Sequence, residues 1–249
     1  MRRPSFAVFL GGVLLAAGAL CFPAWSAPGP EWAAIPGANP AAVAWLDPKE
    51  AGQASLTAAL FANSSEASYS AGYAVPDTGR GAASLVLTYS RTWVSGATDE
   101  ARSYAYSWAR RWRPRLAAGA TVRLERRQYW VDALGATAPR SGPGLDLGAI
   151  WLADDRTWVG VALQDVFDTV LPSDGGHSDV LPMSLQLSAG RRVSPQLSLS
   201  LEGRDVTANT QAGPSWRAEV AFRRGNLTYR AAALAGAVYG WSTGVTARW

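Results

Sequence analysis

The sequence predicts an all-β, single-domain fold: a transmembrane, antiparallel up-and-down β-barrel of about twelve strands, within a range of about ten to fourteen. Three observations predict it. Apolar and polar residues alternate through most of the chain, short connections alternate with longer ones, and aromatic residues gather near the ends of the alternating segments. A two-sheet sandwich also alternates, but it gives no reason for sorted connections or for aromatic residues at strand ends.

The final ten residues show the alternation most clearly. Trp241, Val245 and Trp249 fall on one face of an extended segment, and Ser242 and Arg248 fall on the other, because successive side chains of a strand point to opposite sides. A closing strand with a terminal aromatic residue is typical of outer-membrane proteins. We therefore expect the barrel-assembly machinery to recognise this strand through Trp249.

Twelve alternating segments follow one another from residue 53 onward, separated by clusters of Gly, Pro, Asp and Asn. Most are close to the ~9–11 residues that a tilted membrane strand needs. The last is expected to pair with the first and the eleventh, which would close the cylinder. The segments are 53–62, 66–75, 81–91, 101–113, 115–130, 144–153, 157–167, 181–193, 196–205, 214–224, 226–235 and 240–249.

The connections between these segments sort by length. If both termini lie in the periplasm, every even-numbered connection is a periplasmic turn, and all of these are short: 76–80, 114, 154–156, 194–195 and 225. The odd-numbered connections face outside and are mostly longer, including 92–100, 131–143, 168–180 and 206–213. Short periplasmic turns that alternate with longer outer loops are typical of outer-membrane barrels.

Tryptophan residues near the segment ends predict aromatic girdles at the two membrane interfaces, where amphipathic rings are favoured. In a sandwich, Trp would more often lie in the middle of a strand, inside the core. The predicted girdle residues are Trp93, Trp112, Trp130, Trp151, Trp158, Trp241 and Trp249.

The first 27 residues read as a secretory signal peptide. Arg2 and Arg3 precede an apolar run from Phe6 to Phe22, and small residues follow, so that cleavage after Ser26 or Ala27 fits. Several glycines interrupt the run, which makes a membrane anchor the weaker interpretation. Removal of residues 1–27 leaves a mature chain of about 222 residues.

The composition excludes several classes of protein. The single cysteine, Cys21, lies within the predicted leader, so a disulfide-stapled secreted domain is excluded. The chain is 48% hydrophobic and only 17% charged, yet the mature part has no stretch of the ~18 apolar residues that a membrane helix needs. The net charge of +4 comes from dispersed Arg rather than from a basic patch, so we expect no nucleic-acid partner.

Residues 28–50 precede the barrel region, 51–249, and are rich in Pro and Ala without alternation. One short helix around 40–46 fits the sequence. The apolar side chains of this segment would be exposed in the periplasm, so we expect the segment to enter the lumen as a plug. The predicted plug residues are Asn39, Pro40, Val43, Trp45 and Leu46.

The polar faces of the segments carry charges of both signs, which alternation directs into the lumen. Two interpretations remain open. The charges either neutralise one another in a structural network that fills a narrow barrel, or they line a selective pore or binding site. The predicted lumen residues are Arg123, Glu125, Arg127, Asp146, Gln164, Gln186, Glu202, Arg204, Arg217, Glu219 and Arg223.

Three segments resemble the PorV-like proteins and their relatives in the fatty-acid-transporter (FadL-like) barrel superfamily. The segment 39–43 (Asn-Pro-Ala-Ala-Val) resembles the signature before their first strand, although Ala42 replaces the usual Gly. The segment 144–150 (Gly-Leu-Asp-Leu-Gly-Ala-Ile) resembles a strand of that family, and 159–166 resembles the next one, with Asp165 in place of Asn. The resemblance implies the fold; it does not imply a substrate.

Other chemistry has little support in the sequence. His177 lies beside Ser and Asp in a Gly-rich loop, and adjacent residues of such a loop rarely converge as a catalytic triad requires. With no cysteine in the mature chain and one histidine, we expect no metal site and no cofactor. An outer-membrane hydrolase is therefore the weakest functional hypothesis.

By resemblance, the leading hypothesis is an outer-membrane protein, not an enzyme, that passes or binds small hydrophobic molecules. The alternative is a non-transporting partner in the secretion or surface attachment of proteins, as PorV-like proteins are. The expected partners are outer-membrane lipid, the assembly machinery, a small hydrophobic ligand, and possible secretion partners in the alternative case.

Overall fold

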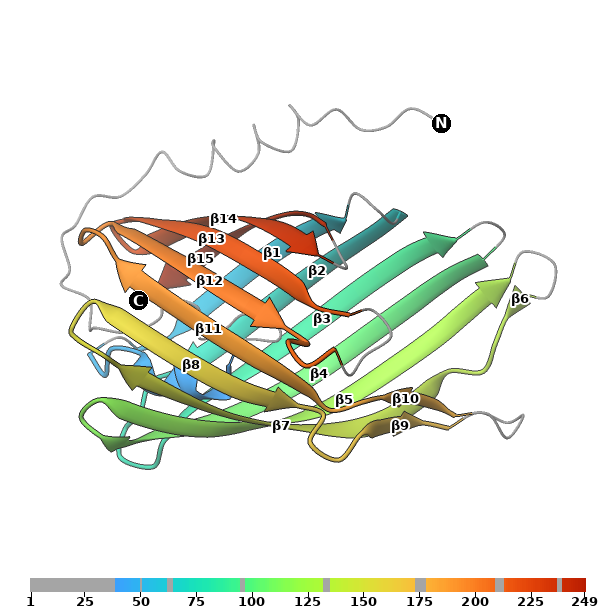
Figure 1. Ribbon diagram of the computed structural model, residues 1–249, viewed down its shortest axis with the longest axis horizontal. Helices are drawn as coiled ribbons and strands as arrows, with labels where there is room; N and C mark the ends of the chain where they lie inside the picture. Colours follow the sequence, from blue (N-terminus) through green and yellow to red (C-terminus); the bar gives the residue numbers. More distant parts are fainter. Residues whose placement is uncertain are drawn as a thin grey trace.

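The computed structural model describes residues 39–49, 51–61, 65–94, 97–131, 135–172, 178–208, 213–236 and 239–249. The predicted leader lies outside this part of the chain. The fold is a closed antiparallel barrel of twelve strands, as the sequence predicts (Figure 1). The barrel strands are β1 (Gln53–Phe61), β2 (Ser65–Val75), β3 (Ala82–Val94), β4 (Ala97–Arg113), β5 (Leu116–Val131), β7 (Arg140–Leu152), β8 (Thr157–Gln164), β11 (Ser184–Arg192), β12 (Leu197–Arg204), β13 (Ser215–Arg224), β14 (Leu227–Gly236) and β15 (Gly240–Arg248).

The first and last strands close the cylinder. β1 pairs with β15 over its whole length, from Gln53 opposite Arg248 to Phe61 opposite Gly240, and β15 pairs with β14 on its other edge. Beyond the strand, the backbone N–H of Ala51 donates to the carbonyl of Trp249 at 2.5 Å. The predicted pairing of the C-terminal strand is therefore confirmed, and no sheet edge stays open at the seam.

The outward face of the barrel is apolar. Val122, Leu124, Leu199 and Val220 are all between 44% and 58% exposed, and many other large apolar side chains are exposed with them. An apolar outer surface of this extent is unusual for a protein surrounded by water and is expected where lipid covers the wall. None of the helical structure in the described ranges is long and apolar enough to cross a bilayer.

The five turns at one end of the barrel are short, as predicted, and lie at 76–81, 114–115, 153–156, 193–196 and 225–226. In the third of these turns, Asp154 Oδ1 accepts the backbone N–H groups of Arg156 at 2.6 Å and Thr157 at 2.7 Å. These bonds hold the pKa of the Asp154 carboxyl below its usual range. We call the end of the barrel with these five short turns the turn end, and the opposite end the loop end.

One predicted outer loop is wrong. Residues 92–100 were expected to form a loop, but β3 continues to Val94 and β4 begins at Ala97. The two strands remain paired up to Val94 opposite Ala97, because cross-strand pairs such as Arg91 with Glu100 extend the ladder beyond the apolar band. The same wall stays tall in β4 and β5, which have 17 and 16 residues against 8 in β12.

Two of the connections at the loop end contain short additional strands. β6 (Gly135–Ala136) pairs with the end of β5, and β9 (Thr169–Leu171) pairs with β10 (Asp179–Leu181) in a small hairpin of its own. Both lie within stretches that the sequence analysis treats as loops.

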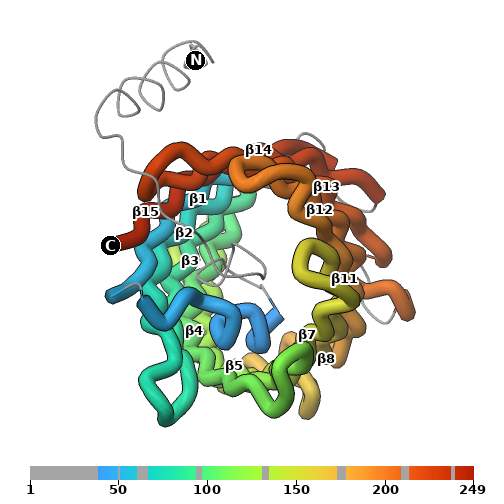
Figure 2. The backbone as a smooth tube through the Cα atoms, turned by 90° about the vertical axis from the view of Figure 1, so that its left-hand side faces the viewer, coloured from blue at the N-terminus to red at the C-terminus, as the bar shows by residue number. Residues whose placement is uncertain are grey.

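The predicted N-terminal helix is present as a 3-10 helix, η1 (Pro40–Trp45). Its N-cap is Asn39, whose side chain accepts the N–H of Ala41 at 3.0 Å. Figure 2, a view along the barrel from the turn end, shows η1 inside the ring of strands and against β4 and β5. All six of its residues are buried, so this part of the N-terminal segment lies inside the barrel. That it plugs the lumen stays a prediction.

One predicted girdle residue is misplaced. Trp158 is only 5% exposed and packs inward, in the same buried cluster as η1. The physical reason is alternation itself: Trp158 shares its face with Gly160 and Ala162, which also face inward, while Val159 and Val161 are exposed. Of the other predicted girdle residues, Trp93, Trp112, Trp130, Trp151 and Trp249 are exposed, and Trp241 is half-buried.

The loss in the free energy of unfolding caused by a charged residue on the outward face should depend on the depth of that residue in the membrane. Val122 lies near the middle of β5 on its outward face, so Val122→Arg should lower the free energy of unfolding by ~2–4 kcal/mol. Gln128→Arg is the matched control on the same strand and face, near the loop end, and should cost only about 0–1 kcal/mol. Urea unfolding in lipid vesicles measures both; equal costs would contradict the assigned membrane depth.

A closed barrel should also resist detergent. Because every strand of the barrel is hydrogen-bonded on both edges, we expect the unheated protein to migrate differently from the boiled protein on a denaturing gel. Identical migration of the two samples would argue against the closed wall.

Candidate functional site

Two segments, which we call inserts, pack on the inner face of the barrel wall. η1 lies at the turn end, against β4, β5 and β7, and the β9–β10 hairpin lies near the loop end, with β9 against β7 and β5. The inner wall between them comes from strands far apart in the sequence.

Asn39 anchors η1 to the wall. Its Nδ2 donates to the carbonyl oxygens of Ala149 in β7 at 3.0 Å and of Val161 in β8 at 2.8 Å. The wall makes room for it with glycines: a Cβ at Gly148 would overlap Asn39 Oδ1, and one at Gly160 would approach its Nδ2 at 3.1 Å. The Asn-Pro turn therefore fits the barrel only because these inward positions lack side chains.

The other end of η1 is held by an arginine and by apolar packing. Arg111 Nε donates to the carbonyl of Ala44 at 2.9 Å, and its guanidinium lies 5.1 Å from the centre of the Trp45 ring. Val43 and Leu46 belong to the same buried cluster as Trp158 and other wall residues. The predicted plug residues are thus all buried.

The β9–β10 hairpin packs on the inner face of β7. Thr169 and Leu171 are buried, and a Cβ at Gly142 would overlap the carbonyl of Val170. Arg140 Nη1 donates to Asp179 Oδ2 at 2.9 Å, which ties β10 to the start of β7. The second insert, like the first, therefore packs against a glycine of β7, where the absence of a side chain leaves room for it.

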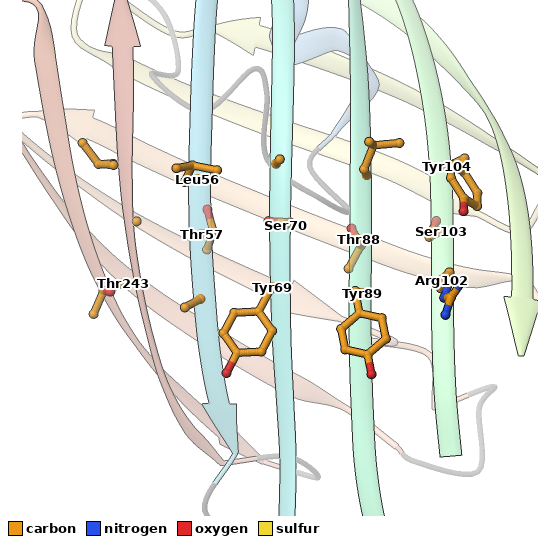
Figure 3. Close-up of a pocket in the computed structure, with 15 residues that line it drawn as sticks. Leu56, Thr57, Tyr69, Ser70, Thr88, Tyr89, Arg102, Ser103, Tyr104 and Thr243 are labelled. Carbon is orange, nitrogen blue, oxygen red and sulfur yellow. The ribbon is translucent and has the colours of Figure 1, made fainter. Parts of the chain in front are cut away.

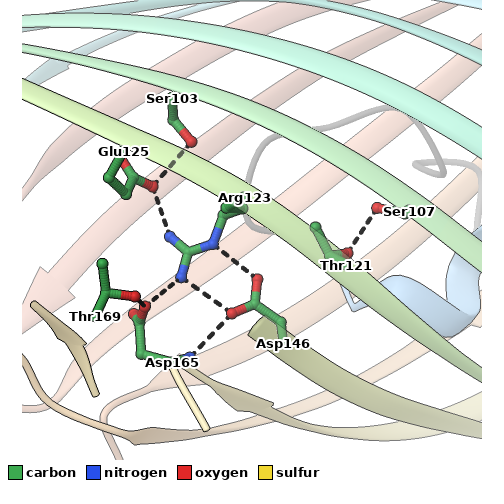
Figure 4. A network of polar contacts seen from close by, with 8 residues as sticks. All are labelled: Ser103, Ser107, Thr121, Arg123, Glu125, Asp146, Asp165 and Thr169. Carbon is green, nitrogen blue, oxygen red and sulfur yellow. Dashed lines mark hydrogen bonds and ion pairs between the residues drawn. The ribbon is translucent and has the colours of Figure 1, made fainter. Parts of the chain in front are cut away.

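A compact polar network lies between the inserts, centred on Arg123 of β5 (Figure 4). Its guanidinium contacts Glu125 Oε1 at 2.7 Å, Asp146 Oδ2 at 3.0 Å and Asp165 Oδ1 at 2.7 Å. The backbone N–H of Asp165 donates to Asp146 Oδ1 at 3.0 Å. Three carboxylates therefore surround one guanidinium in a largely buried position, a set of charge-assisted bonds that fixes β5, β7 and the end of β8 to one another.

Two hydroxyl groups complete the network. Ser103 Oγ of β4 donates to Glu125 Oε1 at 2.9 Å, and Thr169 Oγ1 of the hairpin donates to Asp165 Oδ1. The network thus joins the β9–β10 insert to the wall. Replacing the central guanidinium would leave buried carboxylates without compensation, which is costly.

All of the predicted lumen residues lie on the inward-facing side, but the structure brings only some of them together. Arg123, Glu125 and Asp146 meet in the network. Arg217 pairs with Glu219 at 2.5 Å, and Arg204 pairs with Glu202, in each case two residues apart on one strand. The other four predicted residues are not part of these ion pairs: Arg127, Gln164, Gln186 and Arg223. Asp165, which the sequence analysis did not assign to the lumen, joins the network.

Asp165 was missed because alternation places it on the outward face, next to inward Gln164. Its backbone φ of +54° ends β8 and turns its side chain into the lumen, a conformation that Asp tolerates better than most residues. β12 ends in the same way: Asp205 has φ +50° and is buried, and each Asp is followed by Val. The repeated Asp-Val after an alternating segment is the sequence signal for both positions.

The lumen wall is chemically uneven. Inward positions of β15 and β1–β4 at the level of the network carry small side chains, mainly hydroxyl-bearing ones such as Thr57, Ser70 and Thr88. The ionic side chains described above come mainly from β5, β7, β12 and β13. One half of the inner wall is therefore neutral and able to form hydrogen bonds, while the other half is charged and carries most of its own ion pairs.

In the part of the chain that the structure describes, no group of three or more His, Cys, Asp or Glu side chains is arranged to hold a metal ion. His177 lies outside the described residues, so the hydrolase hypothesis stays untested.

Comparison with known proteins supports the fold. No protein-family model matches the chain, and no curated protein sequence does. Among solved structures, the monoaromatic hydrocarbon channel CymD matches with a TM-score of 0.58 and 10% identity, over 85% of this chain and 90% of its own. The toluene transporter TodX of Pseudomonas putida matches at 0.55 and 12%, over 90% and 94%. The KdgM porin matches at 0.55 and 6%, over 78% and 98%.

Identities this low show the fold alone. CymD and TodX agree with the barrel fold that the resemblance to FadL-like proteins implies. Membership of the FadL-like or the PorV-like group stays an expectation. What each of these proteins carries is a property of that protein, because side chains rather than the barrel determine the cargo.

Release of the plug should be measurable through Asn39. Asn39→Ala removes both bonds to the wall while leaving the barrel strands intact, so it should raise single-channel conductance in planar bilayers. Asp47→Ala is the control: its carboxylate accepts the N–H of Lys49, at 3.0 Å, in the same segment. Unchanged conductance in the Asn39 variant would mean that η1 does not limit passage.

Proposed function

We propose that this protein is an outer-membrane channel for small, neutral molecules that combine an apolar body with a hydrogen-bonding group. The observation that carries the proposal is the chemical character of the inner wall between η1 and the β9–β10 hairpin. Its neutral half offers hydroxyl groups and small side chains, and the ion pairs of its charged half form within the wall itself. Cargo with a hydroxyl group can therefore bind without displacing an ion pair.

The apolar outer wall supports a location in the outer membrane, as does the architecture shared with the hydrocarbon channels and with a porin. Cargo with an apolar body fits the likeness to CymD and TodX, which are described as hydrocarbon channels or transporters. The hydroxyl-lined wall adds the polar requirement. Anions are disfavoured, because the Arg123 network holds three carboxylates against one guanidinium.

Single-cysteine blocking tests whether cargo passes through the lumen. The predicted mature chain contains no cysteine, so Ala59→Cys introduces one thiol on the inward side of β1, and Leu60→Cys introduces one at the next, outward position. Attachment of a bulky maleimide to residue 59 should reduce the uptake of phenol by cells to that of cells without the protein. The same label on residue 60 should leave uptake unchanged.

Comparing the uptake rates of three compounds distinguishes the channel from the non-transporting assembly partner. We expect uptake to be fastest for phenol, slower for toluene and slowest for benzoate, because the wall favours a neutral hydroxyl group. If no compound enters faster than in cells without the protein, and Asn39→Ala does not open a path, the channel is excluded and the non-transporting assembly partner becomes the better hypothesis.

A further inference from the structure

The outward face of the wall formed by β15, β1, β2, β3 and β4 carries a trough (Figure 3). It has a volume of about 660 Å³ and lies between two rows of outward side chains. One row includes Leu56 and Leu87, and the other includes Tyr69 and Tyr89. Its floor is the backbone of the inward residues between the rows, and the lining is mostly apolar. A trough of this size accommodates part of a lipid chain.

A basic cluster lies at one end of the trough. Arg102 of β4 belongs to the row of Tyr89, and it lies directly opposite Arg126 of β5 in the β4–β5 register. Both side chains are exposed on the lipid-facing side. Two like charges opposite each other on neighbouring strands destabilise the sheet unless an anion lies between them.

The carboxylate nearby does not balance this cluster. Glu100 lies 3.8 Å from Arg102 and 3.7 Å from Arg91, so it is shared between two guanidinium groups. It also accepts the hydroxyl of Tyr89, at 3.1 Å. Within the described residues, Arg126 has no ion-pair partner. The cluster therefore contains three guanidinium groups and one carboxylate.

The depth of the cluster matches that of a lipid headgroup. On β5 the outward positions from Leu116 to Leu124 are apolar, and Arg126 is the next outward position. At about 3.4 Å per residue and a tilt of about 40°, Arg126 lies about 26 Å along the membrane normal from Leu116, which is the height of the apolar band of such a barrel. Arg102 and Arg126 thus lie at the boundary on the loop end.

We propose that Arg102 and Arg126 bind the phosphate of a lipid A molecule in the outer leaflet, and that an acyl chain of this lipid lies in the trough. Guanidinium groups bind phosphate oxygens through paired hydrogen bonds, and two of them together suit a phosphate monoester. The Tyr89 ring, 6.0 Å from the Arg102 guanidinium, helps to hold the latter at the trough. The site is independent of the cargo that passes through the lumen.

Binding of fluorescent lipid A to the detergent-purified barrel tests the proposal. The double variant Arg102→Gln/Arg126→Gln should weaken binding by about tenfold or more, the loss expected for charge-assisted hydrogen bonds. The control is Arg110→Gln, which removes an outward arginine from the same strand at the turn end. The control should bind as the unaltered protein does. The gel shift between unheated and boiled samples verifies that every variant folds.

Competitors distinguish the sources of the phosphate. Unlabelled lipid A should displace the probe, whereas phosphatidylcholine and inorganic phosphate at equal concentration should not. Ala58→Phe, which fills the trough without changing its charge, should weaken binding of lipid A as well. The proposal is overturned if the double variant binds as tightly as the control, or if phosphatidylcholine or inorganic phosphate competes as well as lipid A does.

Discussion

The interior of this barrel depends on how closely other segments can approach the inner face of β7. Three inward positions of this strand are glycines, and the fourth member of the set is Asp146. Gly142 leaves room for the backbone of β9, Gly144 for Thr169, and Gly148 for Asn39. Asp146, between them, binds Arg123. With any larger side chain in these positions, neither insert could reach the wall. One strand therefore determines where both inserts attach to the inner wall.

The same strand explains the motif that resembles FadL-like barrels. Gly-Leu-Asp-Leu-Gly, from 144 to 148, places two glycines and one carboxylate on the inward face, and its leucines face outward. Each inward member has a partner in another segment: Thr169, Arg123 and Asn39, respectively. The motif therefore encodes the attachment of inserts to a barrel wall. It constrains the architecture and leaves the cargo to other residues, which fits barrels of one fold that carry different molecules.

Much of the fold could be predicted because strand alternation is a local property. It gave the twelve strands, the closing pair of strands and the inward direction of residues such as Arg123 and Glu219. The incorrect predictions arise where a contact with a residue distant in the sequence determines the position of a side chain. Trp158 was assigned to a girdle from its place near a strand end, although it lies in the buried cluster that includes η1. Asp165 was not predicted to face the lumen, because its positive φ interrupts the alternation of the strand. The network geometry required knowledge of which strands are neighbours.

Charge on the two faces of the wall follows different rules, and this difference separates structural from binding residues. Inside, Arg217 and Glu219 lie two residues apart on one strand, so their charges are balanced within a local segment. Arg123 is balanced by carboxylates from three segments. Outside, Arg102 and Arg126 are opposite each other with one shared carboxylate nearby. A sheet that balances its buried arginines so closely has no structural reason to leave an exposed pair in excess. An anion from the surroundings is the component that would balance it, because headgroup phosphates lie at that depth.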